Sequence, residues 1–204
     1  KEVNALFQKG IYHYAQADYD HAIEMFLTTA EKAEEYEYWR RVATSYQMLG
    51  ELSATVMNDK TQARGYLMKA LTIHKKIGSE RGIAGTYNDI GLQCEDMDSA
   101  LYYHRKSLEI DLRIDHLYGI ADSYHNLAST FKAIKEYDSA LYYYKKTLVM
   151  DQQNAGEYEQ SISLNSIGAL HLETRNLTLA DSNLQASLEM GLRNDFKGQV
   201  SYSY

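Results

Sequence analysis

Histidine has the widest chemistry of the residues in this sequence, because an imidazole can bind a metal ion or carry a proton near neutral pH. The chain has seven histidines, and no two lie four residues apart. That spacing would place two metal ligands on one face of a helix. His13 and His171 fall at aromatic positions of the repeat described below, and a packed core role is favoured for both. His74 and His104 are expected to be solvated or to lie between helices, so the sequence predicts no metal site.

Other catalytic arrangements are also missing from the sequence. The chain has no glycine-rich phosphate loop, no nucleophile elbow and no Cys–His pairing. Its many carboxylates are expected to face solvent on amphipathic helices. The one cysteine, Cys94, allows neither an internal disulfide nor a cysteine-based zinc site. We therefore expect no enzyme activity, no catalytic residue and no cofactor.

Tyrosine is unusually abundant, at 19 residues against four phenylalanines. Two runs, Tyr102 with Tyr103 and Tyr142 with Tyr143 and Tyr144, could stack on bases or sugars. A tyrosine ring can also pack its apolar face in a thin helical layer while its hydroxyl group stays in water. We favour the packing role for both runs.

The composition favours a mostly helical globular chain. Of 204 residues, 45% are hydrophobic, 24% are charged and none is proline, the residue that breaks helix interiors. The formal net charge is -7 and basic residues are scattered among acids. Direct nucleic-acid binding is not expected, because phosphate binding needs clustered Lys and Arg. The sequence also has no apolar run long enough to span a bilayer and no signal-peptide pattern at Lys1.

An internal repeat organises the whole chain. Three clear copies, DYDHAIEM, DMDSALYY and EYDSALYY, and two weaker ones, KTQARGYL and NLTLADSN, begin at Asp18, Asp96, Glu136, Lys60 and Asn176. Their anchoring alanines, separated by 41, 37, 40 and 40 residues, are Ala22, Ala63, Ala100, Ala140 and Ala180. Downstream of Ala140, apolar residues recur at Leu141, Tyr144 and Leu148, which is one face of a helix.

A second signature precedes the alanine in the later copies: a bulky residue, then Leu or Ile followed by Gly or Ala. It is YNDIG from Tyr87, YHNLA from Tyr124 and LNSIG from Leu164. The two signatures together resemble the tetratricopeptide repeat. The fourth copy is the most complete, with the family's helical positions filled by Tyr124, Leu127, Ala128, Phe131, Tyr137, Ala140, Tyr144 and Leu148. The period of about 40 exceeds the family's 34, and this longer form is similar to repeats of kinesin light chains and bacterial peptide-sensing regulators.

The resemblance implies an all-α fold, a right-handed superhelical solenoid of antiparallel helix pairs. Residues 1–204 would form a single array, with approximate repeats at 3–35, 36–79, 80–119, 120–159 and 160–197. Residues 198–204 would start a truncated sixth repeat, which indicates a fragment of a longer polypeptide. Ala128 and Ala140 are expected where two helices cross closely, and a larger side chain there would cost roughly 1–3 kcal/mol.

The second and third copies depart from the regular spacing. In the second copy 17 residues separate Tyr46 from Ala63, where nine separate Phe131 from Ala140. We interpret the eight extra residues, near Leu52 to Asp59, as a lengthened hairpin that projects from one edge of the array. The third copy lacks three residues before Ala100, which predicts a tight turn near Cys94.

The resemblance also implies a binding surface on the concave face, which the first helices of the repeats form. The matching polar positions are Arg40, Arg41, Asn88, Asp89, His125, Asn126, Asn165 and Ser166, with Lys132 one turn further on. An asparagine amide can both donate to and accept from a peptide backbone, and Arg40 and Arg41 could receive a carboxylate. These residues match the family's carboxylate clamp only partly. Alternatively, they cap and link neighbouring helices.

We therefore expect a protein- or peptide-binding scaffold, the sensory or interaction domain of a larger bacterial signalling or transcriptional regulatory protein. The expected partner is a protein or peptide, and the segment is expected to be soluble, on the cytoplasmic or periplasmic side of the cell. One alternative is a self-assembly module, a homodimer whose contact includes Phe7, Tyr12 and Tyr202. Others are a free-standing adaptor and an appendage of an enzyme elsewhere in the polypeptide.

Overall fold

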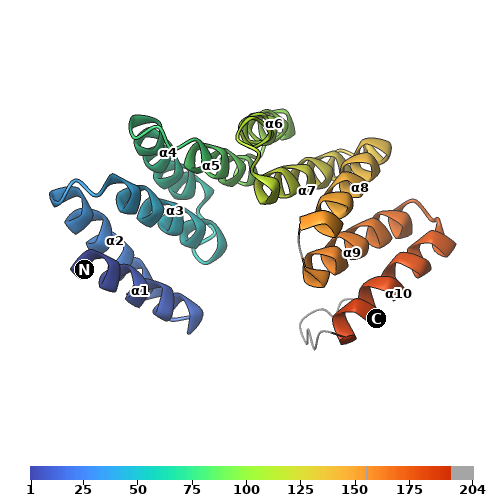
Figure 1. The fold of residues 1–204 in the computed structure, drawn as a ribbon, viewed down its shortest axis with the longest axis horizontal. Coiled ribbons are helices and arrows are strands. Elements are labelled where there is room, and N and C mark those ends of the chain that lie inside the picture. The colour runs from blue at the N-terminus through green and yellow to red at the C-terminus, as the bar shows by residue number, and fades with distance from the viewer. Residues whose placement is uncertain (155, 194–204) are drawn as a thin grey trace. The chain divides into compact units, whose positions relative to one another are not determined.

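The computed structural model describes residues 1–154 and 156–193, so the expected sixth repeat at 198–204 lies outside the described residues. The described residues form ten α-helices and no strand (Figure 1). The helices are α1 (Glu2–Ala15), α2 (Tyr19–Glu35), α3 (Trp39–Thr55), α4 (Lys60–Lys76), α5 (Glu80–Leu92), α6 (Met97–Arg113), α7 (Leu117–Ala133), α8 (Tyr137–Asn154), α9 (Glu157–Glu173) and α10 (Leu177–Arg193).

Consecutive helices are joined by short turns and pack side by side in antiparallel pairs (Figure 1). The chain divides into two compact units, unit 1 at Lys1–Ile110 and unit 2 from Asp111 onward. Within unit 1, α1 to α5 each pack against the next helix, and within unit 2 the same holds for α7 to α10. The prediction of an all-α array of helix pairs is confirmed.

Each helix pair is held by one close contact that recurs with the repeat. A small residue on the first helix lies against a large side chain on the second. The small residues are Gly10, Gly50, Gly91, Ala128 and Gly168, and their large partners are Phe26, Leu67, His104, Tyr144 and Leu184. A Cβ added to any of the four glycines would lie only 2.5–2.9 Å from its partner's side chain. The helices therefore approach as closely as a missing Cβ allows.

The anchoring alanines lie one helical turn before these large side chains. All five are at most 3% exposed: Ala22, Ala63, Ala100, Ala140 and Ala180. Ala128 and Ala140, which were expected at a close helix crossing, are both fully buried in one cluster with Tyr144. Because a buried alanine leaves room for the neighbouring backbone, the spacing of the alanines sets the register in which the pairs stack.

The turns between helices end the helices without proline. At the end of α1, Ala17 has a left-handed φ of 57°. The amide of Asp18 donates to the carbonyl of His13 at 2.9 Å, and the amide of Ala17 donates to Tyr14 at 3.0 Å, which is the Schellman arrangement. The left-handed residues of equivalent turns are Glu37, Gly78, Lys135 and Arg175. These bonds satisfy carbonyl groups at the ends of α1, α2, α4, α7 and α9.

The expected lengthened hairpin near Leu52 to Asp59 is wrong. Helix α3 has 17 residues, as α7 has, and only residues 56–59 separate it from α4. Tyr46 lies seven residues into its helix and corresponds to Tyr124, so the equivalent of Phe131 is Ser53. Ser53 is buried and donates its hydroxyl hydrogen to the Leu49 carbonyl at 2.7 Å. Because the position of Phe131 holds a serine in the second copy, Tyr46 was aligned with Phe131 in its place, and eight residues seemed to be inserted.

The third copy is shorter because its first helix is shorter. Helix α5 has 13 residues, where α7 has 17, and ends at Leu92. The missing residues therefore come from the helix end, and the connection at 93–96 is no tighter than its counterpart at 134–136. Cys94 is buried in the cluster that contains Leu67, Ile90 and Ala100.

The tyrosine runs pack in the same way in both units. Tyr103 contacts Tyr87 on the preceding helix at a ring-centroid distance of 5.9 Å, and the equivalent pair in unit 2, Tyr143 and Tyr124, is also 5.9 Å apart. Tyr144 is buried. The outer rings, Tyr102 and Tyr142, are more than half exposed and contact the next ring edge-on. Most of the ring area thus serves packing.

None of the described helices combines the length and the apolar character that crossing a bilayer requires.

The close contact between paired helices predicts opposite effects for two glycine substitutions. In Gly50→Ala the new Cβ would meet Leu67 at 2.9 Å and the Ala63 carbonyl oxygen at 3.3 Å. We expect the free energy of unfolding to fall by about 1–3 kcal/mol. Gly65, in helix α4, has no atom within 4 Å of an added Cβ, so Gly65→Ala should raise it by roughly 0.5–1 kcal/mol. Urea denaturation measures both, and equal effects would contradict the close-contact argument.

Candidate functional site

A cavity of about 530 Å³ lies between the first helices α3 and α5 of unit 1. One face of α3 lines it with Thr44, Gln47, Met48, Glu51, Ala54 and Thr55, and the rest of the lining is Leu67, Asp89, Leu92 and Gln93. This volume is in the range of sites that hold a small ligand or a partner's side chain. The walls combine apolar side chains with amides and carboxylates. We call this space the α3–α5 cavity.

A hydrogen-bonded chain fixes one wall of the α3–α5 cavity. The Gln47 Nε2 group donates to Asp89 Oδ2 at 3.1 Å, and Gln47 Oε1 lies 3.1 Å from Nε2 of His74 on α4. Since an amide oxygen only accepts, His74 Nε2 carries the proton. His74 is 3% exposed, and burial, followed by the nearby Arg40 charge, lowers the pKa of its imidazole. A neutral histidine therefore orients the Gln47 amide toward Asp89.

A second carboxylate of the α3–α5 cavity is held by helix α1. The Tyr14 hydroxyl donates to Glu51 Oε1 at 2.7 Å. This hydrogen bond, with burial, raises the pKa of Tyr14 to about 12. Glu51 and Asp89 thus give the cavity an acidic character.

The predicted groove residues of α3 divide between solvent and helix packing. Arg40 is exposed, and its carbonyl accepts from the Thr44 hydroxyl at 2.6 Å. Arg41 donates to Asn4 Oδ1 at 3.1 Å, and its guanidinium lies 4.1 Å from the centre of the Phe7 ring. Arg41 therefore links α3 to α1, which is the alternative role considered for it.

The two predicted residues of α5 point to different surroundings. Asp89 lines the α3–α5 cavity, whereas Asn88 is buried, and its Oδ1 lies 3.0 Å from His104 Nδ1 on α6. Adjacent residues of a helix differ by about 100° in direction, so only one of the pair can face the cavity. Asn88 serves as a link between α5 and α6.

The predicted residues of unit 2 lie on α7 and α9. Lys132 forms an ion pair with Glu173 at 2.8 Å beside a second cavity of about 420 Å³. His125 contacts the Tyr144 ring edge-on at 5.4 Å, and burial lowers the pKa of His125. The pair Lys132–Glu173 ties α7 to α9, and His125 contributes to packing.

The remaining three predicted residues of unit 2 are partly exposed. Asn126 lies on α7, and Asn165 and Ser166 lie on α9. The Ser166 hydroxyl donates to the Ile162 carbonyl of its own helix at 3.0 Å. The proposed role of Asn126 and Asn165 in holding a peptide backbone stays a prediction.

The sequence did not identify Gln47 and Glu51 as residues of the cavity, and it did not show that His74 and His104 are buried. His74 and His104 are buried at 3% and 1% exposure, so the solvated alternative for them is wrong. His104 occupies the position that Tyr144 fills in the fourth copy, 40 residues on. The repeat register alone could have identified it as a core residue. The register also reaches Gln47, because YQMLG from Tyr46 aligns with YNDIG from Tyr87 and puts Gln47 at the position of Asn88. For Glu51 the sequence carries no comparable signal.

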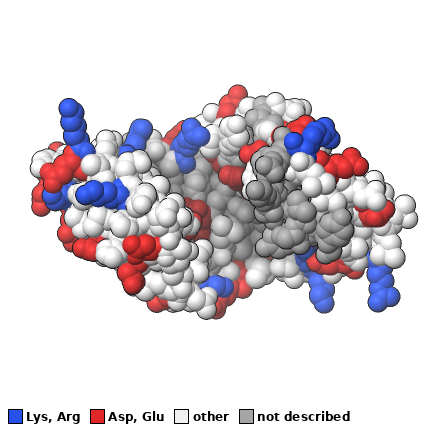
Figure 2. Space-filling model, turned by 90° about the horizontal axis from the view of Figure 1, so that it is seen from below, with Lys and Arg blue, Asp and Glu red and all other residues white. Residues whose placement is uncertain are grey.

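Of the residues proposed for the self-assembly contact, the structure describes two, and one of them is exposed as expected. Phe7 is buried beneath Arg41, whereas Tyr12 is 63% exposed. Tyr202 lies outside the described residues. On the face shown in Figure 2, Lys and Arg of the described residues are interspersed with Asp and Glu.

The fold and the recurring contact define a repeat scaffold built from helix pairs. Residues 82–153, from α5 to α8, match the family model of the tetratricopeptide repeat. This part of the chain consists of tetratricopeptide repeats, and the resemblance stated from the sequence is confirmed. No curated protein matches the sequence of the chain.

Solved structures share the fold over nearly the whole chain. Aspartyl phosphate phosphatase F from Bacillus subtilis has a TM-score of 0.85 and 14% identity, covering 99% of this chain and 54% of its own. A signal transduction ATPase with a tetratricopeptide repeat sensor from Pyrococcus horikoshii has 0.78 and 17%, covering 98% and 32%. The Rap conjugation gene regulator of plasmid pLS20, in complex with the Phr* peptide, has 0.72 and 16%, covering 95% and 54%. This chain thus spans about half or less of the length of these proteins.

The buried His104 predicts a loss of stability in acid. Burial lowers the pKa of His104 from 6.5 to about 4. The unfolded chain therefore binds a proton at a higher pH than the folded chain does. The contribution of His104 to stability is complete above pH 6.5 and is lost as the pH falls toward 4. We expect this group to reduce the free energy of unfolding by about 2–3 kcal/mol between pH 7 and pH 4.5.

His104→Gln provides the comparison, because an amide can still donate to Asn88 while it does not titrate. Urea denaturation at pH 7 and at pH 4.5 should show a smaller loss in His104→Gln than in the unchanged chain. The other buried histidines, such as His74, titrate in both proteins and cancel in the difference. Equal losses would show that His104 is not held neutral.

Proposed function

We propose that this chain is a non-catalytic, peptide-binding scaffold of a larger bacterial signalling or regulatory protein. We further propose that the α3–α5 cavity binds a basic side chain of the peptide. The observation that carries the proposal is the pair of carboxylates, Glu51 and Asp89, that line one cavity on the first helices. Each carboxylate accepts a hydrogen bond from another helix of unit 1. Tyr14 on α1 donates to Glu51, and Gln47 on α3 donates to Asp89.

The cavity suits a long cationic side chain. An ammonium or guanidinium group could donate to both carboxylates, and hydrogen bonds to charged groups contribute roughly 1.5–3 kcal/mol each. The aliphatic part of a Lys or Arg side chain would pack on the apolar lining, which includes Met48, Leu67 and Leu92. This reverses the charge of the partner expected from Arg40 and Arg41, because Arg41 is engaged with α1.

Similar folds support a regulatory role. One is described as a gene regulator in complex with a peptide and another as the sensor part of a signal transduction ATPase. A third is described as a phosphatase. We assign no catalysis to this chain, because the α3–α5 cavity offers carboxylates and amides in hydrogen bonds with Tyr14 and His74 and no activated nucleophile beside a base. The site lies within unit 1 alone.

The proposal predicts that charge-neutral variants of the cavity lose affinity. Peptides selected on the chain from a random phage-displayed library should be enriched in Lys or Arg. Glu51→Gln and Asp89→Asn keep the oxygens that accept from Tyr14 and Gln47 but remove the charges. We expect the two changes together to weaken binding of a selected peptide at least about tenfold. Fluorescence anisotropy with the labelled peptide measures the affinity.

Glu35→Gln is the matched control, because Glu35 is an exposed carboxylate at the end of α2, away from the cavity. It should leave the affinity unchanged, and thermal melting should show that all variants are folded. Selection of acidic peptides, or unchanged affinity in the double variant, would refute the assignment. A stable homodimer that the cavity changes do not affect, measured by sedimentation, would favour self-assembly instead.

A further inference from the structure

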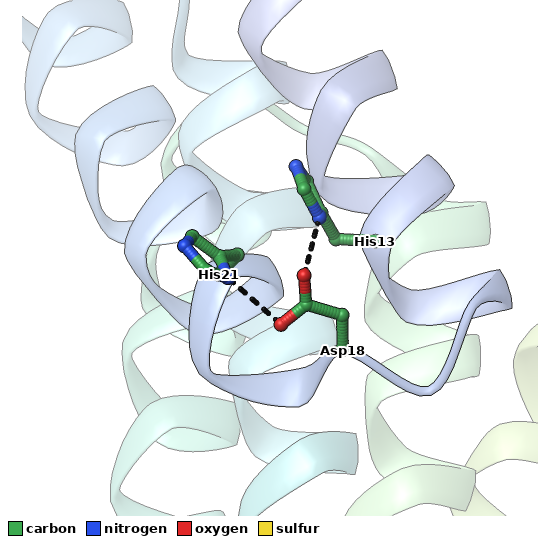
Figure 3. Close-up of side chains that lie close together, drawn as sticks. All are labelled: His13, Asp18 and His21. Atoms are coloured by element: carbon green, nitrogen blue, oxygen red, sulfur yellow. Dashed lines mark hydrogen bonds and ion pairs between the residues drawn. The ribbon is translucent and has the colours of Figure 1, made fainter.

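Three side chains with metal-binding chemistry meet at the turn between α1 and α2 (Figure 3). Nδ1 of His13 lies 2.9 Å from Asp18 Oδ2, and Nδ1 of His21 lies 2.8 Å from Asp18 Oδ1. The two imidazole rings stack on each other with centroids 5.2 Å apart. One ligand atom from each of the three residues lies within 4.8 Å of the others. We call these residues the turn cluster.

The fold dictates this meeting. The Schellman bond from the Asp18 amide to the His13 carbonyl brings the two residues together although they are five apart in sequence. Asp18 is also the N-cap residue of α2, and His21 lies three residues into the following helical turn. Residues at such a spacing share one side of a helix. The backbone therefore places both rings around one carboxylate.

Equivalent turns show that the set of three is specific to the first turn. After α6, Asp111 and His116 form a hydrogen bond of 2.9 Å, but the residue three positions further on is Gly119. In the turn after α9, the residues equivalent to His13 and Asp18 are His171 and Asn176. The turns after α2, α4 and α7 share the backbone geometry without the three ligands, so packing of the repeat does not require them.

We propose that His13, Asp18 and His21 form a binding site for a divalent transition metal ion, with Zn²⁺ as its best-suited occupant. Two imidazoles and one carboxylate are ligands that zinc accepts, whereas Mg²⁺ and Ca²⁺ prefer oxygen alone. Three protein ligands leave a fourth position for water or for a group of a partner. This is the ligand count of an open zinc site.

The movements required to bind the ion are small. Tetrahedral bonds of 2.0–2.1 Å to nitrogen place ligand atoms roughly 3.4 Å apart, so atoms now within 4.8 Å must approach. The side chain of His21 is 62% exposed and that of Asp18 is 40% exposed, so both can rotate without disturbing the core.

A bound ion would connect the end of α1 to the start of α2. It would replace two hydrogen bonds to Asp18 with coordination bonds across the same turn. The first helix pair would then gain stability with metal concentration, because the ion binds the folded turn and the unfolded chain offers no preformed site. The proposal is independent of the α3–α5 cavity and of peptide binding.

The test is titration of the tag-free, chelator-treated chain with ZnCl₂ by calorimetry, together with thermal melting at each zinc concentration. We expect one saturable Zn²⁺ per chain and a rising melting temperature. The Asp18 side chain makes no capping hydrogen bond, and the side chains of Asp18 and His21 are 40% and 62% exposed, so Asp18→Asn and His21→Gln should both fold. Each should weaken zinc binding at least about tenfold, since losing even an indirect ligand contact costs 10–100-fold.

His116→Gln is the matched control, because it removes a histidine that forms a similar hydrogen bond, to Asp111, at the turn after α6. It should bind Zn²⁺ as the unchanged chain does. Absence of saturable binding, or equal affinity in the unchanged chain, Asp18→Asn and His21→Gln, would overturn the proposal. Co²⁺ in place of Zn²⁺ gives an independent reading, since its visible absorption should change in the unchanged chain and not in His21→Gln.

Discussion

The contact between a small residue on each first helix and a large side chain on its partner is the constraint on which the structure depends. At Gly10, Gly50, Gly91 and Gly168 the approach leaves no room for a Cβ. Such close packing fixes the rotation of both helices about their axes. Every other residue of the pair then has a determined direction. The α3–α5 cavity and the turn cluster both follow from it, because one is a face of α3 and the other is a junction of α1 and α2.

This constraint explains how much of the fold could be predicted from sequence. Alanine spacing reports the helix crossings directly, so the repeat and the all-α fold were accessible. The register failed at Ser53, where a small hydroxyl residue stands at the position of Phe131 and donates a hydrogen bond to its own helix. For His104 the sequence left a solvated and an interhelical role open, and the structure shows the interhelical one, at a position held elsewhere by Phe26 or Tyr144. Residue type alone does not mark a polar residue as part of the core, although its position in the repeat does.

The candidate binding site was less accessible for a different reason. Asp89 was predicted as a binding residue and lines the α3–α5 cavity. Two other predicted residues, Asn88 and Arg41, instead form hydrogen bonds that link neighbouring helices. Whether a polar side chain faces a ligand or a neighbouring helix depends on partners from other repeats. Gln47 and Glu51 belong to the cavity because His74 and Tyr14 hold them there. Such long-range hydrogen bonds leave no periodic signal in the sequence.

The turn cluster shows the same dependence on geometry at short range. A search for histidines four residues apart assumes that both ligands lie on one helix, whereas His13 and His21 lie on two helices and converge through the turn. The useful pattern is instead a histidine, a carboxylate five residues later and a histidine three residues after that, spanning a helix end. The backbone bond between Asp18 and His13 recurs in turns that carry other side chains. A scaffold whose turns share one geometry can therefore acquire a ligand set at one of them with no change to its packing, because the close helix contacts lie elsewhere in each pair.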